Sequence, residues 1–76
     1  MSEVRKKNSK NLRLFGENLR KIRIKKGISQ EDLAYQAGIS YTSVNRIEAG
    51  TLNTTIATCF ELAKALEIPV KELFDF

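Results

Sequence analysis

Apolar residues recur three and four positions apart along this chain, the spacing that places side chains on one face of an α-helix. In the first half, Phe15, Leu19 and Ile22 form such a stripe. The stripe predicts a helix over residues 12–26 with one buried face. Gly27 is expected to end this helix, because glycine readily adopts the left-handed conformation that follows a helix.

Shorter stripes predict four more helices, so the expected fold is all-α. A stripe of Leu33, Ala34 and Ala37 begins at Gln30, and Gly38 is expected to end that helix. Three later helices are expected over residues 41–49, 56–66 and 70–74. Serine or threonine precedes three of the four helices, where a hydroxyl can cap free backbone N–H groups; these residues are Ser29, Ser40 and Thr55. The buried stripe of the fourth helix is expected to be Ile56, Cys59, Leu62, Ala63 and Leu66, and that of the fifth Val70, Leu73 and Phe74.

Residues 1–11 are polar and carry no apolar stripe. Such a segment buries too little apolar surface to offset the entropy of ordering it. We therefore expect a disordered basic arm at residues 1–11 and one helical domain at residues 12–76. The arm could reach along a nucleic acid or have no role of its own.

Basic residues are concentrated in the first third of the chain. Residues 1–26 hold ten Lys and Arg against two Glu, whereas residues 27–76 hold three basic and seven acidic residues. The net charge of +4 is therefore the balance of +8 and −4. A basic half favours a phosphate backbone as partner, although a solvated helix surface would give the same composition.

Composition argues against several other classes of protein. The chain has no histidine and a single cysteine, Cys59, so an internal disulfide and a Cys/His zinc site are excluded and no metal or cofactor is expected. No apolar run is long enough to span a membrane, and no apolar segment follows the charged N-terminus as in a secretory signal. A cytoplasmic protein without catalytic activity is expected.

The stretch from Gln30 to Glu48, QEDLAYQAGISYTSVNRIE, resembles the helix-turn-helix of the Cro/repressor-like (Xre-type) DNA-binding family. The resemblance is carried by the residues that open the first helix, form the turn and bury the second helix: Gln30, Leu33, Ala34, Gly38, Val44, Ile47, Glu48 and Gly50. It extends over residues 15–74 and implies a five-helix lambda-repressor-like domain. It also implies a structural ion pair between Arg23 and Glu48 that joins the first helix to the third.

The helix at 41–49 is expected to read DNA bases. Val44 and Ile47 lie on its buried side, so the outward face carries Tyr41, Thr42, Asn45 and Arg46. The major groove presents hydrogen-bond donors, acceptors and thymine methyl groups that such side chains match; Arg46 can bond guanine bidentately and Asn45 can pair with adenine. Candidate phosphate contacts are Ser29, Gln30, Ser43, Asn53 and Thr54, of which Gln30, Asn53 and Thr54 are implied by the resemblance.

Apolar residues toward the C-terminus suggest a homodimer, as is common in the family. The candidates are Phe60, Ile68, Val70, Phe74 and Phe76, although these could instead cover the core of a monomer. The expected function is a sequence-specific regulator of transcription, an autoregulating repressor that binds a palindromic double-stranded DNA operator. Two narrower roles stay open: a restriction–modification controller, and an antitoxin with a protein partner.

Overall fold

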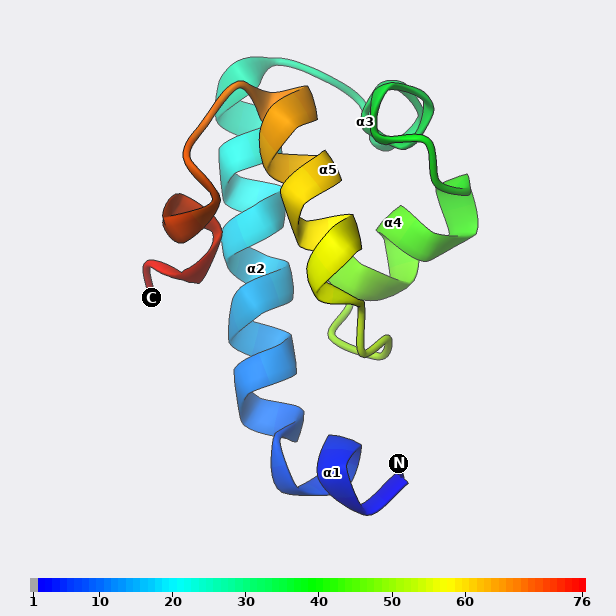
Figure 1. Cartoon of the computed structure of the whole chain (residues 1–76), viewed down its shortest axis with the longest axis vertical. Helices are drawn as coiled ribbons and strands as arrows, with labels where there is room; N and C mark the ends of the chain where they lie inside the picture. Colours follow the sequence, from blue (N-terminus) through cyan, green and yellow to red (C-terminus); the bar gives the residue numbers. More distant parts are fainter. Residues whose placement is uncertain (1) are drawn as a thin grey trace.

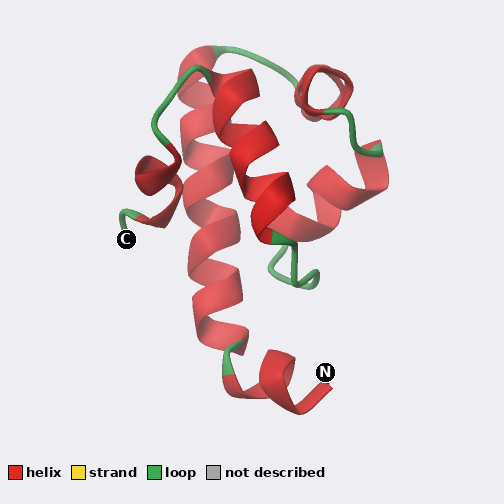
Figure 2. Cartoon of the chain, viewed as in Figure 1, coloured by secondary structure: helices red, strands yellow, loops and turns green. Residues whose placement is uncertain are grey.

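The computed structural model describes residues 2–76, and within them every regular element is a helix (Figures 1 and 2). The longest helix, α2, is the axis of the molecule, with α5 beside it and η1 on its other side (Figure 1). The last element is a 3₁₀-helix rather than an α-helix. In order, the elements are α1 (Ser2–Lys7), α2 (Ser9–Lys26), α3 (Gln30–Ala37), α4 (Tyr41–Glu48), α5 (Ile56–Leu66) and η1 (Val70–Phe74).

Local chemistry sets the starts of α3, α4 and α5 and the ends of α2 and α3 as predicted. A hydroxyl oxygen accepts a hydrogen bond from the backbone N–H three residues later at the start of α3, α4 and α5. The distances are 3.0 Å from Asp32 to Ser29, 3.0 Å from Ser43 to Ser40 and 3.1 Å from Thr58 to Thr55. Gly27 and Gly38 end α2 and α3 with φ angles of 75° and 72°, in the left-handed region.

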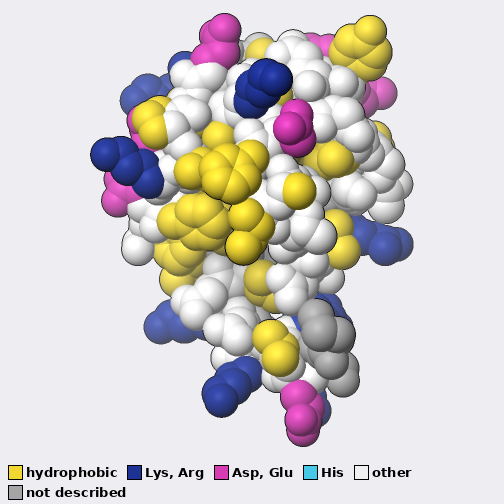
Figure 3. Space-filling model, in the orientation of Figure 1, with side chains coloured by type: hydrophobic (Ala, Val, Ile, Leu, Met, Phe, Trp, Pro, Cys, Tyr) yellow, Lys and Arg dark blue, Asp and Glu magenta, His cyan; other side chains and the backbone are white. Residues whose placement is uncertain are grey.

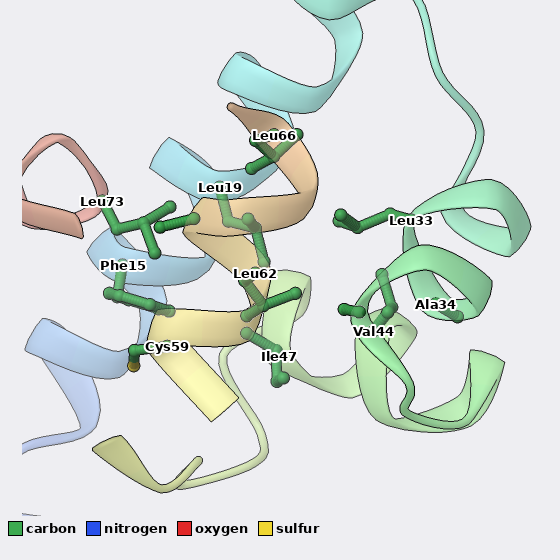
Figure 4. Close-up of a cluster of buried hydrophobic side chains, with 12 residues drawn as sticks. Phe15, Leu19, Leu33, Ala34, Val44, Ile47, Cys59, Leu62, Leu66 and Leu73 are labelled. Carbon is green, nitrogen blue, oxygen red and sulfur yellow. The ribbon is translucent and has the colours of Figure 1, made fainter. Parts of the chain in front are cut away.

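A single core joins all helices except α1. The close-up in Figure 4 shows side chains from α2, α3, α4, α5 and η1 gathered around Leu62. Leu19, Leu33, Val44 and Leu73 around it are completely inaccessible to solvent. None of the helices within residues 2–76 is long and apolar enough to cross a membrane.

The long helix α2 crosses the end of α4 at unusually short range, and two glycines permit this. A Cβ atom added to Gly16 would lie 2.2 Å from the carbonyl oxygen of Ile47 and 2.7 Å from that of Glu48. A Cβ atom on Gly50 would lie 2.7 Å from the Cα atom of Arg13. Any side chain at either glycine would therefore push the two helices apart.

The prediction of a disordered arm at residues 1–11 was wrong for the part that the structure describes; Met1 lies outside it. Residues 2–7 form α1, and α2 begins at Ser9 rather than at residue 12. The segment is rich in Lys and Arg, which favour helices without an apolar stripe. It is also held to the rest of the molecule by a hydrogen bond of 3.1 Å from the Arg5 guanidinium to the carbonyl oxygen of Thr51.

Two predicted core positions also differ. Ile56 is 76% exposed, because it is the first residue of α5 and its side chain lies at the edge of a surface cleft rather than in the core. Phe74 is half-exposed, although one face of its ring packs on Phe15 with 5.0 Å between ring centroids. Helix α4 ends at Glu48, one residue earlier than predicted.

Candidate nucleic-acid interface

Helix α4 presents a polar face to solvent and an apolar face to the core. Val44 and Ile47 on the apolar face are 0% and 1% exposed. The predicted base-reading residues all lie on the exposed face: Tyr41, Thr42, Asn45 and Arg46. With α3 packed against it across the Gly38 turn, α4 is the second helix of a helix-turn-helix (Figure 1).

The predicted ion pair between α2 and α4 is present and buried. Arg23 donates from Nε to Glu48 Oε2 at 2.6 Å and from Nη2 to Glu48 Oε1 at 3.0 Å. Its Nη1 donates to the carbonyl oxygen of Ile28 at 2.9 Å, which also fixes the loop before α3. The hydrogen bond with Glu48 is the main cause that raises the pKa of Arg23 above its ordinary value. A bidentate pair of this kind fixes the orientation of α4 against α2.

Gln30, at the start of α3, connects the ion pair to the exposed face of α4. Its Nε2 atom donates to Glu48 Oε1 at 2.9 Å, and its Oε1 atom accepts a long bond of 3.5 Å from Asn45 Nδ2. Both ends of the Gln30 amide therefore have protein partners. The side chain holds Asn45, a predicted base-reading residue, through a network that begins in the interior.

A shallow groove of about 490 Å³ lies between α2, α3 and α4 beside this network. It is lined by Arg20, Ser29, Gln30, Tyr41 and Asn45, together with Arg23 and Glu31. Arg20 was not among the predicted site residues. Its position one helical turn before Arg23 is the signal that could have identified it, because residues three apart share a helix face.

The other predicted phosphate-binding residues divide into two groups. Ser29 and Ser43 take part in helix capping: Ser29 caps α3, and the Ser43 hydroxyl bonds to the hydroxyl of Ser40 at 2.8 Å. Asn53 is exposed and Thr54 is half-buried in the loop between α4 and α5. Ser43 lies in the first turn of α4, Ser29 lies in the groove beside α4, and Asn53 and Thr54 lie beyond its C-terminal end. Together with Gln30, these candidates surround the exposed face of α4 rather than form one cluster.

A second surface of α5 and η1 is apolar, and Figure 3 shows it as the large hydrophobic patch on the viewed face. Three of the predicted dimer residues, Phe60, Phe74 and Phe76, are 53–54% exposed. Ile68 and Val70 are instead half-buried and pack against the core. An apolar cleft of about 420 Å³ adds Leu52 and Ile56, neither of which had been predicted as a dimer residue.

Cys59 is not placed for covalent chemistry. Its side chain is buried in the core, and burial raises the pKa of the thiol. A thiol with a raised pKa holds less of the nucleophilic thiolate form. Among residues 2–76, no group of three His, Cys, Asp or Glu side chains is arranged to hold a metal ion.

Comparison with known proteins agrees with this geometry. Residues 19–73 match a family model, HTH_3, described as helix-turn-helix. The chain is 39% identical over 64 residues to the control protein C.BamHI of Bacillus amyloliquefaciens, and this alignment covers 83% of the chain and 79% of that protein.

Solved structures share the fold as well. The restriction-modification controller protein C.AhdI of Aeromonas hydrophila is 39% identical, with a TM-score of 0.86 over 88% of this chain and 97% of that one. The hypothetical transcription factor NHTF from Neisseria is 31% identical, with a TM-score of 0.79 over 84% and 72% of the two chains. From the extent of the match and the geometry of α3 and α4, the chain belongs to the helix-turn-helix family.

Proposed function

We propose that this protein is a sequence-specific, double-stranded DNA-binding regulator of transcription that reads a palindromic operator through the major groove. The observation that carries the proposal is the exposed polar face of α4, which is held rigidly against α2 by the Arg23–Glu48 pair. The relatives named as control or controller proteins and as a transcription factor support the same function.

Base selection and positioning are assigned to different residues. Tyr41, Thr42, Asn45 and Arg46 select the sequence, because their side chains are exposed and carry donors, acceptors and apolar surface suited to base edges. Phosphate contacts fix the position of the domain without reading sequence. The candidates for these are Ser29, Gln30, Ser43, Asn53 and Thr54, to which the structure adds Arg20.

A homodimer would supply the affinity that one small domain lacks. The surface of Phe60, Phe74 and Phe76, extended by Ile56, is the interface that we assign to it. Symmetric pairing through this surface places two copies of α4 on half-sites about one DNA turn (~34 Å) apart. A two-fold protein of this kind reads a palindromic operator.

Control of a restriction–modification operon is the narrower role that the relatives favour. The chain matches 97% of the length of C.AhdI and 79% of C.BamHI, so it aligns with nearly the whole of one controller protein. Autoregulation would then follow from an operator near the protein's own promoter. The antitoxin alternative stays a prediction; a neighbouring gene for a methyltransferase or nuclease, as opposed to a small toxin, separates the two roles.

Fluorescence anisotropy with labelled DNA from upstream of the gene, against scrambled DNA of equal length, tests the proposal. The wild-type protein is expected to prefer the upstream DNA, and Arg46→Ala to reduce that preference by about 1–3 kcal/mol. Lys64→Ala is the matched control, because it removes one positive charge from an exposed position on α5. Equal binding of both DNAs by the wild type would refute sequence-specific recognition of this region.

Sedimentation tests the dimer separately from DNA binding. Placing charge on the patch with Ile56→Asp and Phe60→Asp is expected to convert a dimer to a monomer, since each aspartate would be desolvated in the interface. Tyr35→Asp is the control, because Tyr35 is 88% exposed on α3, outside this surface. An unchanged mass for the Ile56/Phe60 variant would show that the interface lies elsewhere.

A further inference from the structure

The N-terminal helix α1 is fixed beside the end of the DNA-reading helix. The backbone N–H of Thr51 donates to the carbonyl oxygen of Arg46 at 3.0 Å, and the Thr51 hydroxyl lies 3.3 Å from the same oxygen. The carbonyl oxygen of Thr51 in turn accepts from Arg5 Nη1 at 3.1 Å. A single residue therefore joins α1 to the last turn of α4.

Three basic residues gather around this junction, and we call Arg5, Lys6 and Arg13 the junction cluster. Lys6 lines a hollow with Leu12 and Gly50, and the backbone of Arg13 lies against Gly50. All three side chains belong to exposed residues. Figure 3 shows several separate Lys and Arg side chains at the lower end of the molecule.

The junction cluster is not neutralised within the chain. Among residues 2–76, the one ion pair is Arg23–Glu48, in the interior of the domain. Glu3 is the only acidic residue of α1, and it lines the same hollow as Lys6 without pairing with it. The cluster thus keeps a net positive charge that a phosphate backbone could neutralise.

The loop between α4 and α5 shows which part of the DNA would meet the cluster. Leu52, Asn53 and Thr54 line the apolar cleft with Phe74 and Phe76, so this loop lies between α4 and the surface that we assign to the dimer. In a symmetric dimer that surface faces the two-fold axis. The junction cluster contacts this loop through Thr51 and Gly50, and it consequently lies toward the centre of the operator.

We propose that the junction cluster is an additional phosphate-binding element that contacts the DNA backbone between the two half-sites. The inference rests on the proposed DNA-binding function and extends it to a helix that lies ahead of the family match, which begins at residue 19. The cluster contributes affinity that is independent of base sequence. It also makes that affinity sensitive to the length of the spacer between half-sites.

The salt dependence of DNA binding tests this inference. Each phosphate that the protein no longer neutralises lowers the slope of log affinity against log salt concentration by about 0.9. Lys6→Gln combined with Arg13→Gln is expected to lower the slope by about 1.8 per bound protomer on the upstream DNA. The matched control is Lys26→Gln with Lys64→Gln, which removes two charges beside the groove at the opposite end of α2. Circular dichroism checks that both variants fold; if the first does not, Lys6→Gln alone should give half the change.

The outcomes separate the two proposals. A wild-type protein without measurable DNA affinity would overturn the proposed function itself. Wild-type binding with the same slope in the junction variant as in the control would overturn only the role of the cluster. Once a footprint locates the operator, methylphosphonates between the half-sites should weaken the wild type but not the junction variant. Equal weakening of both proteins would place the cluster away from the central phosphates.

Discussion

Replacing Gly16 by alanine tests the close crossing of α2 and α4. Helix propensity alone predicts a gain, because alanine stabilises a helix interior by about 1 kcal/mol relative to glycine. The structure predicts a loss, because the new Cβ atom would lie 2.2 Å from the carbonyl oxygen of Ile47. Restoring an ordinary contact of 3.4 Å requires the two helices to separate by about 1.2 Å, the difference between these distances.

The expected magnitude follows from the two opposing effects. Overpacking of a well-packed contact costs about 3 kcal/mol at the upper end of its range, which suits so short a distance. After the propensity gain, the free energy of unfolding should fall by about 2 kcal/mol, which for a domain of this size lowers the melting temperature by about 8–16 °C. Thermal and urea denaturation followed by circular dichroism measure both quantities.

An isolated peptide of residues 9–26 provides the control for Gly16→Ala. The peptide lacks α4, so the same substitution should raise its helical content while it destabilises the whole protein. A higher melting temperature of the substituted protein would refute the reasoning, because it would mean that the carbonyl groups of Ile47 and Glu48 can move without cost. Weaker DNA binding by the substituted protein is also expected, because the displaced carbonyl groups belong to the end of α4.

Three further changes test other parts of the fold. Glu48→Ala should lower the free energy of unfolding in urea by about 3–5 kcal/mol, because it leaves the Arg23 charge buried and unpaired. The double variant Arg23→Met with Glu48→Met should lose less stability than the sum of the single variants Arg23→Met and Glu48→Met, and additive losses would contradict the coupling. Asn18→Ala removes two hydrogen bonds, of 2.8 and 2.9 Å, to the carbonyl oxygens of Glu72 and Leu73. The substitution should lower the free energy of unfolding by about 1–2 kcal/mol and speed hydrogen exchange in η1. Unchanged exchange would show that Asn18 does not hold η1 in place. Burial raises the pKa of the Cys59 thiol in the folded protein. The unfolded chain therefore loses this proton more readily, and the free energy of unfolding should fall as pH rises through the ordinary thiol value of 9.0. Alkylation of Cys59 should be slow until urea unfolds the protein, and a pH dependence equal to that of Cys59→Ala would contradict the assignment.

The starts of α3, α4 and α5 and the ends of α2 and α3 were predictable, because they depend on residues that are close in sequence. Ser29 and Ser40 bond to amides three residues away, and Gly27 and Gly38 end helices through their own backbone freedom. The exposed face of α4 was predictable for the same reason, since helical periodicity alone separates its polar side from its buried side.

Features that depend on how distant helices meet could not be predicted in this way. The role of Gly16 appears only once α2 is placed on the end of α4, and Asn18 finds its partners 54 and 55 residues away. Arg5 holds α1 in place through a carbonyl group 46 residues later, a contact that the composition of that segment does not reveal. Ile56 has the spacing of a core residue, but it is exposed because it lies at the first position of α5.

The hydrogen bonds that run from Glu48 through Gln30 to Asn45 restrict how the DNA preference of such a protein can evolve. Under the proposed function, a substitution at Asn45 changes a base contact, and it also removes the partner of the Gln30 amide oxygen. Its effect on affinity must then depend on which residue occupies position 30, so the two substitutions will be non-additive. Arg46 has no side-chain bond to this network among the described residues, and it can be exchanged more independently. New operator preferences are therefore reached more readily through position 46 first, with positions 30 and 45 changing as a pair.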